Sequence, residues 1–411
     1  MRRMLVTAAT TLTLALPLVV APAAVAALGP TVPATQFGMT VNGLAGRSFV
    51  PLGTGSVRLW DVGATWAQVN TSPGVYTWAP LDAAVNRARA MGVRDIDYVL
   101  GSTPYWARIP SSAEKGDLYG PGSASHPARD SYYLDYLRAV VLRYKGRITT
   151  YEIWNESNLP IFYRGTPTQL ARLTLAAYRL IKSLDPRATV GSPSWLLRYW
   201  VPQREAQLAA LRAVGWPFDI ASVHAYPYPL QGPDSRVALL VSFKSRLAAL
   251  GTRKPVWDTE VNFGNRFPGY PLRTYVGWTA AQYVARAYID SLRYGIARTY
   301  WYSWDGRTGG IDMIDSLGRP NAAGVAFTTV RKWTVGLHWN GCTTASNGIS
   351  RCALMTSTGA KRSIIYTRGG VVRTAVLPHA FAMCTLDGRC RTVKPGTAYY
   401  LTGTPQFVLG A

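Results

Sequence analysis

The sequence predicts an α/β protein, with a (β/α)8 TIM barrel in residues 27–336 and a small antiparallel β module in residues 337–411. Two observations support this prediction. Short apolar runs alternate with amphipathic helical segments in the longer part, which is typical of a parallel sheet, and eight such repeats indicate a closed barrel. After Gly336, short β-type runs are separated by Gly, Pro, Asn and Asp, as in antiparallel strands joined by turns. The chain of 411 residues has room for both parts, because a barrel needs about 250 residues.

The barrel strands are predicted from runs rich in apolar and β-favouring residues. They are 37–41, 56–60, 96–100, 149–154, 188–193, 218–226, the run that ends at Glu260, and 298–304. Amphipathic spacing predicts helices at 81–91, 132–144, 167–184, 203–214, 237–250, 278–294 and 322–335. Thr166 is expected to cap the third of these helices, with Pro167 at its first position. The polar loop 107–130 is long enough to shape a cleft at the mouth of the barrel.

The β module is predicted from runs at 363–367, 371–377, 399–402 and 406–409, and it contains every cysteine of the chain: Cys342, Cys352, Cys384 and Cys390. Four cysteines allow three pairings, and proximity favours Cys342 with Cys352 and Cys384 with Cys390 in an exported protein. A zinc site is the rival, but the spacings do not fit one and no histidine stands beside the cysteines in a ligand pattern. The shortness of the module favours a structural extension over a separate carbohydrate-binding role.

The N-terminus has the three parts of a secretory signal peptide, predicted at residues 1–26. A basic start is followed by the apolar stretch 5–20 and by the small residues of 21–26. This pattern predicts a secreted or cell-wall-associated protein. An uncleaved membrane anchor is the alternative, which the alanine-rich end disfavours. No later stretch of the sequence is long and apolar enough to cross a bilayer.

The composition restricts the classes of partner. Hydrophobic residues make up 48% of the chain and charged residues 16%, which excludes a disordered protein. The formal net charge of +23 favours anionic surroundings, such as acidic polysaccharide, wall phosphate, lipid headgroups or nucleic acid. The basic residues form no single run and no nucleic-acid motif accompanies them, so we expect a general association with an anionic cell envelope and no specific nucleic-acid partner. No metal or cofactor motif is present, so neither is expected, and the chain is taken as a monomer.

Two glutamates stand where predicted barrel strands end. Glu156 follows the run Thr150-Tyr-Glu-Ile-Trp-Asn, and Glu260 ends the run Pro255-Val-Trp-Asp-Thr-Glu. Barrel enzymes place their catalytic groups at the carboxyl ends of the strands. A pair of carboxylates is what the hydrolysis of glycosidic bonds requires.

Trp154-Asn155-Glu156, together with Glu260 after Pro255-Val-Trp, resembles the acid/base and nucleophile strands of the retaining clan A glycoside hydrolases with (β/α)8 barrels. The chain is most similar to glycoside hydrolase family 39, which includes secreted bacterial endoglycosidases that cut exopolysaccharides. The stretches that support the resemblance are Val57–Asp61, Gly74–Trp78 with Leu81 and Asp82, and Ser102–Trp106. The resemblance covers residues 37 to 336. It implies that Glu156 is the general acid/base and Glu260 the nucleophile.

The resemblance and the strand positions also suggest a set of substrate-binding residues: Asn155, Arg58, His224, Tyr226, Trp304, Trp106 and Trp60. Asn155 would bind the sugar 2-hydroxyl, and Arg58 would lie beneath Glu260 and keep it ionised. His224 and Tyr226 would donate hydrogen bonds to the nucleophile, and the tryptophans would offer ring faces to sugars. Each has a structural alternative: a loop cap, a surface arginine, a structural histidine or tyrosine, or a core tryptophan.

Three aspartates near strand ends compete for catalytic roles, namely Asp61, Asp258 and Asp305. Asp258 is the rival nucleophile, because it precedes Glu260 by two residues and both would therefore point to the same side. The sequence thus predicts a secreted retaining glycoside hydrolase that cleaves an extracellular or cell-wall polysaccharide by double displacement through a glycosyl-enzyme. The alternative is a catalytically inactive barrel that binds glycan or the cell envelope. Loop shapes, which no motif specifies, set the sugar, the linkage and endo or exo action.

Overall fold

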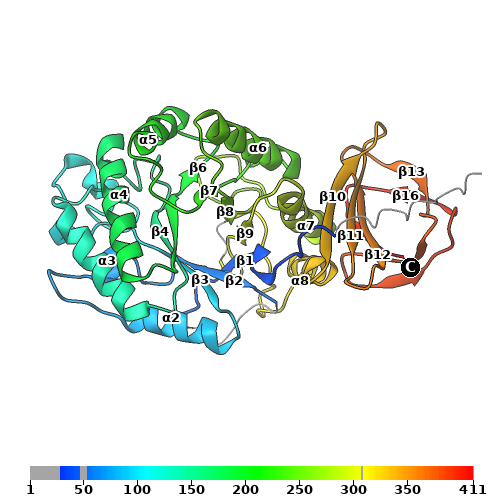
Figure 1. The fold of residues 1–411 in the computed structure, drawn as a ribbon, viewed down its shortest axis with the longest axis horizontal. Helices are drawn as coiled ribbons and strands as arrows, with labels where there is room; N and C mark the ends of the chain where they lie inside the picture. The colour runs from blue at the N-terminus through cyan, green and yellow to red at the C-terminus, as the bar shows by residue number, and fades with distance from the viewer. Residues whose placement is uncertain (1–27, 47–52, 307–308, 411) are drawn as a thin grey trace, which may run out of the picture.

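The computed structural model describes residues 28–46, 53–306 and 309–410 (Figure 1). The predicted signal peptide lies outside the described residues. The chain forms a parallel barrel surrounded by helices, with an antiparallel β module at its side. This arrangement confirms the predicted fold class.

Nine parallel strands form one sheet in the order β5-β4-β3-β2-β1-β9-β8-β7-β6. They are β1 (Phe37–Thr40), β2 (Ser56–Leu59), β3 (Asp95–Val99), β4 (Thr150–Trp154), β5 (Thr189–Pro193), β6 (Trp195–Leu196), β7 (Ala221–His224), β8 (Val256–Val261) and β9 (Arg298–Trp301). β5 and β6 are consecutive pieces of one strand, of which β5 pairs with β4 and β6 with β7. Within β5, the Ser192 N–H donates to the carbonyl oxygen of Ile220, the residue directly before β7. The strand made of β5 and β6 therefore joins β4 to β7, and the nine pieces close an eight-stranded barrel.

The helices surround this sheet (Figure 1). They are the short α1 (Trp66–Val69) and the long α2 (Ala79–Ala90), α3 (Asp130–Tyr144), α4 (Pro167–Leu184), α5 (Val201–Ala213), α6 (Pro233–Ala249), α7 (Gly277–Arg293) and α8 (Ala322–Thr334). The Thr166 hydroxyl accepts from the Gln169 N–H, and the Gln169 side chain accepts from the Thr166 N–H. This reciprocal cap satisfies two backbone donors and begins α4 at the predicted residue.

The main core lies between the strands and the helices, where the outward side chains of the strands meet the apolar helix faces. The interior of the barrel is different. It holds an apolar floor of Ile220, Trp257 and Tyr300, and the fully buried charged residues Arg58 and Glu152 form an ion pair. Buried charges of this kind cost free energy unless they are paired, so their presence marks the interior as more than a packing core.

The β module contains a six-stranded antiparallel sheet in the order β10-β11-β12-β17-β14-β15, and β13 pairs with β16 separately. The strands are β10 (His338–Thr344), β11 (Ile349–Met355), β12 (Lys361–Thr367), β13 (Val372–Ala375), β14 (Ala380–Cys384), β15 (Cys390–Thr392), β16 (Ala398–Leu401) and β17 (Gln406–Gly410). Disulfides join Cys342 to Cys352 and Cys384 to Cys390, each across directly opposed positions of neighbouring strands.

The module packs against α7 and α8 of the barrel (Figure 1). Phe407 of β17 stacks on Trp333 of α8, with ring centroids 5.3 Å apart and planes 9° from parallel. The Tyr366 hydroxyl donates to Asp290 of α7 at 2.9 Å. The apolar core of the barrel therefore continues into one face of the module. None of the helices in the described residues is long and apolar enough to span a membrane.

Candidate active site

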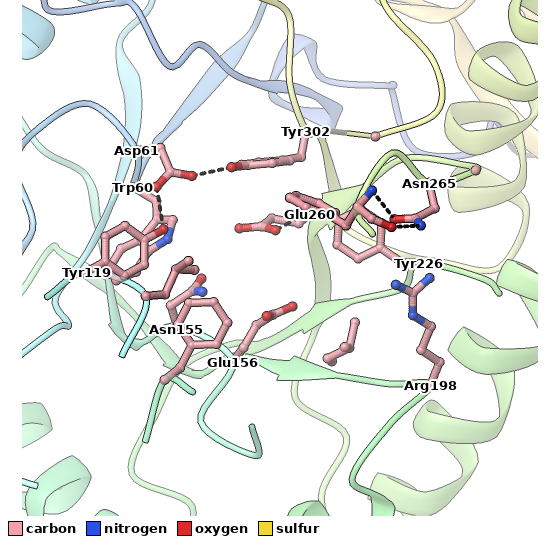
Figure 2. Close-up of a pocket in the computed structure, with 16 residues that line it drawn as sticks. Trp60, Asp61, Tyr119, Asn155, Glu156, Arg198, Tyr226, Glu260, Asn265 and Tyr302 are labelled. Atoms are coloured by element: carbon pink, nitrogen blue, oxygen red, sulfur yellow. Dashed lines mark hydrogen bonds between the residues drawn. The ribbon is translucent and has the colours of Figure 1, made fainter. Parts of the chain in front are cut away.

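A pocket of about 210 Å³ opens at the carboxyl ends of the barrel strands (Figure 2). Its lining combines carboxylates, an arginine and aromatic rings. The lining residues are Trp60, Asp61, Leu118, Tyr119, Asn155, Glu156, Phe162, Leu196, Arg198, Tyr226, Glu260, Gly264, Asn265, Phe267, Tyr302 and Gly309. Both predicted catalytic glutamates belong to it. Leu118 and Tyr119 come from the long polar loop that follows β3.

An irregularity in β8 aims Glu260 into this pocket. Asp258 pairs with Val223 of β7, but Glu260 pairs with the next residue, His224, so β8 contains one extra residue. The pairing with β9, on the other side of β8, shows the same extra residue, because a step of three residues in β8, from Asp258 to Val261, matches a step of two residues in β9, from Thr299 to Trp301. Side chains of a strand alternate between its two faces, and one inserted residue reverses the alternation beyond it. Glu260 therefore faces the barrel interior, while Asp258 faces the helices.

The structure thus contradicts the expectation that Asp258 and Glu260 share a side. Asp258 is fully buried beneath α6, where Arg236 donates to its Oδ2 from Nε at 2.8 Å and from Nη2 at 2.6 Å. The Ala225 N–H donates to its Oδ1 at 2.9 Å. Both oxygens have structural partners and neither lines the pocket, so Asp258 is not a rival nucleophile.

Glu260 is held by three side chains. Arg58 donates from Nη1 to Oε1 at 2.5 Å, and the Tyr226 hydroxyl donates to Oε2 at 2.8 Å. His224 Nδ1 lies 3.4 Å from Oε2. Burial raises the pKa of Glu260, and the adjacent His224 ring and the charge of Arg58 oppose this rise. These contacts favour the ionised carboxylate.

Glu156 has a different environment. Its backbone lies in the left-handed region at φ 40°, a conformation that costs energy for a residue with a side chain, and the Ser194 hydroxyl accepts from its N–H at 3.0 Å. His224 Nδ1 lies 2.8 Å from its Oε1. Burial raises the pKa of Glu156 to about 7, against the lowering effect of Arg198 and Arg58. Glu156 therefore keeps its proton at pH values where an exposed glutamate has lost it.

The two carboxylates face the same space (Figure 2). Three atoms lie within 4.8 Å of one another: one oxygen of the Glu156 carboxylate, one oxygen of the Glu260 carboxylate and one ring nitrogen of His224. This trio has the composition of a metal site. Arg58, however, is already in contact with Glu260 and supplies positive charge there, as it also does for Glu152.

A buried charged layer beneath the pocket was missed by sequence reasoning. Arg58 donates from Nη2 to Glu152 at 2.6 Å, and burial, with the nearby Glu152 charge, raises the pKa of Asp97. Both Asp97 oxygens are buried without a hydrogen-bond partner among the described residues, which makes the charged form costly there. The available signal was a charged residue inside each of two apolar strands, at Asp97 and Glu152.

The predicted binding residues take different positions. Asn155 lines the pocket, and its Oδ1 accepts from Arg58 Nη2 at 2.8 Å, so the amide nitrogen is left for a ligand. Tyr226 also lines the pocket. Arg58 and His224 are fully buried, and they contact the glutamates instead of the space where a substrate would lie. Both lie at Glu260, where their expected roles put them, so they position the glutamates and do not belong among the substrate-binding residues.

Two of the three predicted tryptophan platforms are wrong. Trp304 lies three residues beyond the end of β9 at Trp301, and its side chain is 1% exposed and packs in the core near Gly324 of α8. Trp106 does not line the pocket, since its Nε1 donates to the Asn70 carbonyl oxygen at 2.8 Å and its ring meets Tyr132. Trp60 lines the pocket with its ring edge-on to Tyr119.

Asp61 organises the wall opposite Arg198 (Figure 2). It accepts from the Tyr119 hydroxyl at 2.6 Å and from the Tyr302 hydroxyl, and so joins the loop after β3 to the end of β9. Tyr302 lines the pocket where Trp304 was expected to. The third aspartate, Asp305, accepts from the N–H groups of Asn42 and Gly43 and has a loop-structuring role.

Comparison with solved structures shows the same fold in glycoside hydrolases. A family 39 glycoside hydrolase from the gut symbiont Bacteroides cellulosilyticus WH2 is 18% identical, with a TM-score of 0.70 over 92% of this chain and 81% of that one. A monomeric β-xylosidase from Caulobacter crescentus CB15 is 16% identical, with a TM-score of 0.63 over 93% and 97%. A family 30 endoxylanase from Clostridium papyrosolvens C71 is 16% identical, with a TM-score of 0.61 over 94% and 98%.

No protein-family model and no curated protein matches the sequence. The likeness therefore lies in the three-dimensional arrangement. The chain has the fold of clan A glycoside hydrolases, as its sequence predicted.

Proposed function

We propose that this protein is a secreted retaining glycoside hydrolase that cleaves O-glycosidic bonds in an extracellular or cell-wall polysaccharide. The observation that carries the proposal is the pair of facing carboxylates, with oxygens within 4.8 Å of each other. Retaining enzymes hold their two carboxyl groups about 5 to 5.5 Å apart, whereas inverting enzymes leave about 6.5 to 9.5 Å for a water molecule. The fold shared with glycoside hydrolases supports the same activity.

The environments of the two glutamates support the roles proposed for them. Glu156, whose pKa is about 7, donates its proton to the glycosidic oxygen as the bond to the anomeric carbon breaks. Glu260, held ionised by Arg58 and Tyr226, attacks the anomeric carbon and forms the glycosyl-enzyme. Glu156 then removes a proton from water, the water oxygen bonds to the anomeric carbon, and Glu260 departs as a carboxylate. The Asn155 amide nitrogen, which is left free when Oδ1 accepts from Arg58, would bind the sugar 2-hydroxyl.

Secretion is part of the proposal. Residues 1–26 have the pattern of a signal peptide, and both cysteine pairs form disulfides. Disulfides persist in oxidising compartments outside the cytosol.

The roles are tested by chemical rescue with azide on activated β-aryl glycosides. Glu260→Ala lacks the nucleophile, so activity should collapse, and azide should attack in its place to give the inverted α-glycosyl azide. Glu156→Ala should still form the glycosyl-enzyme from activated substrates, and azide should release it as the β-glycosyl azide. The anomeric configuration of each product, read by NMR, reports the role of the missing glutamate independently of rate.

Two results would contradict the proposal. Activity retained in Glu260→Ala would show that another group is the nucleophile. Failure of the wild-type protein to hydrolyse any aryl glycoside in a panel, together with glycan binding, would favour the inactive barrel.

A further inference from the structure

Arg198 stands apart from the catalytic groups in the pocket. It follows β6, and its guanidinium lies near Tyr226 and Asn265 on the side opposite Asp61 (Figure 2). Nη1 donates to the carbonyl oxygen of Pro227, and the guanidinium lies 5.7 Å from the Tyr226 ring centroid. The side chain is thus held in place at the wall of the pocket.

Arg198 forms no ion pair with a carboxylate of the described part of the chain, although its charge acts on Glu156, whose pKa it lowers. Its Nε is buried without a hydrogen-bond partner among the same residues. Arg266, on a neighbouring loop, shows the usual arrangement, with both Nη atoms on the Asp312 carboxylate. A half-buried guanidinium with an unbonded Nε and no ion pair is costly, and a site that binds an anion recovers this cost when the anion enters.

The cleft continues past Arg198. A second hollow of about 500 Å³ shares Leu196, Arg198, Asn265 and Phe267 with the catalytic pocket. Its further wall carries the rings of Tyr199, Trp200 and Tyr270. The side chains of Trp200, Phe267 and Tyr270 are 55%, 55% and 54% exposed. Exposed apolar rings that line a groove mark a binding surface, and here the groove is contiguous with the catalytic pocket.

One wall of this groove belongs to the acid/base side of the pocket. It includes Leu159, Pro160 and Ile161, which follow Glu156 on the same loop, and Arg198 follows β6, the second piece of the strand whose first piece, β5, pairs with β4. Phe267 and Tyr270, on the loop after Glu260, also line the groove. The acid protonates the oxygen that leaves with the departing sugar. Contact with the Glu156 loop makes the groove a site for the part of the chain that leaves.

We propose that the Arg198 groove binds the leaving part of an anionic polysaccharide, with Arg198 against a carboxylate or sulfate ester on a sugar unit close to the scissile bond. The inference deepens the proposed function and rests on it for the position of the scissile bond. The net charge of +23 agrees with it, because a positive protein attracts an anionic polymer. The open groove suits cleavage within a chain.

Binding tests the inference without turnover. In a Glu156→Gln background, calorimetry measures the affinity for hexasaccharides from alginate, pectate and hyaluronan, and for the same hexasaccharides after chemical reduction of their carboxylates. At least one acidic hexasaccharide should bind about tenfold or more tightly than its reduced form, the range expected for a charge-assisted hydrogen bond. Adding Arg198→Gln should abolish this preference, and Arg198→Lys should restore part of it.

Arg266→Gln is the matched control, because it removes an equal charge that Asp312 already pairs. It should preserve the preference for the acidic form. A preference for carrageenan hexasaccharides over their desulfated forms, again lost in Arg198→Gln, would assign the substituent as a sulfate ester. Equal binding of acidic and neutral forms, equal weakening of both by Arg198→Gln, or binding of no acidic hexasaccharide would each overturn the inference.

The outcome is separable from that of the proposed function. Acidic hexasaccharides bound through Arg198 by a protein that hydrolyses no glycoside would leave this inference standing and remove the catalytic proposal. Hydrolysis of aryl glycosides with no preference for acidic hexasaccharides would do the reverse.

Discussion

At the scale of single residues, His224 connects the two catalytic candidates. Its Nδ1 lies 2.8 Å from Glu156 and 3.4 Å from Glu260, and burial lowers its pKa. A neutral imidazole can bridge two carboxyl groups of which one is protonated and the other ionised. The proposed roles thus depend on a buried residue that does not itself line the pocket.

The raised pKa of Glu156 leads to a prediction about stability. Between about pH 4.5 and pH 7 the folded protein retains a proton that the unfolded chain has lost, so the free energy of unfolding falls as pH rises through this window. Glu156→Gln has no such proton. The difference in the free energy of unfolding between Glu156→Gln and wild type should therefore change between pH 5 and pH 8 in favour of the variant, by up to about 3 kcal/mol.

Urea denaturation at pH 5 and pH 8 measures this difference. An effect of Glu156→Gln that is the same at both pH values would contradict a raised pKa at this position.

At the scale of elements, the extra residue in β8 separates two carboxylates that a regular strand would place together. Asp258 joins β8 to α6 through Arg236, and Glu260 faces the pocket. Asp258→Asn should therefore destabilise the protein by about 3 to 5 kcal/mol, because it leaves Arg236 buried and unpaired. The folded fraction should keep its glycosidase activity, whereas Glu260→Gln should lose it.

Activity is normalised to the folded fraction, measured by circular dichroism. Loss of activity in a folded Asp258→Asn variant would contradict the assignment of Asp258 to the scaffold.

The sequence predicted elements well where local chemistry defines them. Helix α4 begins and ends at its predicted residues because Thr166 and Pro167 determine its first turn. The register of β8 could not be predicted, since an inserted residue is defined only by the pairing with β7 and β9. The choice between Tyr302 and Trp304 failed for a similar reason: only the tertiary structure shows where β9 ends and which ring then faces the pocket.

The same distinction applies to the candidate site. Glu156 and Glu260 were predictable because they stand at strand ends in a recognisable order. Asp97 and Glu152 were not singled out, because only the tertiary structure shows that these charged residues of apolar strands lie beside Arg58. Arg198 lies outside every predicted strand and every motif, so only the pocket reveals it.

At the scale of the whole molecule, the β module and the barrel share one core. Phe407 is 6% exposed and stacks on Trp333, and Tyr366 bonds Asp290 from the same sheet. Arg293 of α7 also donates to Ser350 of β11 at 3.0 Å. Such an interface favours cooperative unfolding over independent melting of two units.

Phe407→Ala tests this coupling. Truncation of a buried phenylalanine costs about 3 to 5 kcal/mol, and here the loss should lower the melting temperature of the barrel as well as that of the module. Thermal unfolding followed by calorimetry should show one transition in both wild type and variant, with glycosidase activity lost at the same midpoint. Phe381, 50% exposed on β14, provides the control, since Phe381→Ala removes the same side chain from the surface and should change the midpoint little. Two separate transitions, with activity surviving the first, would show that the module unfolds independently and does not share the core of the barrel.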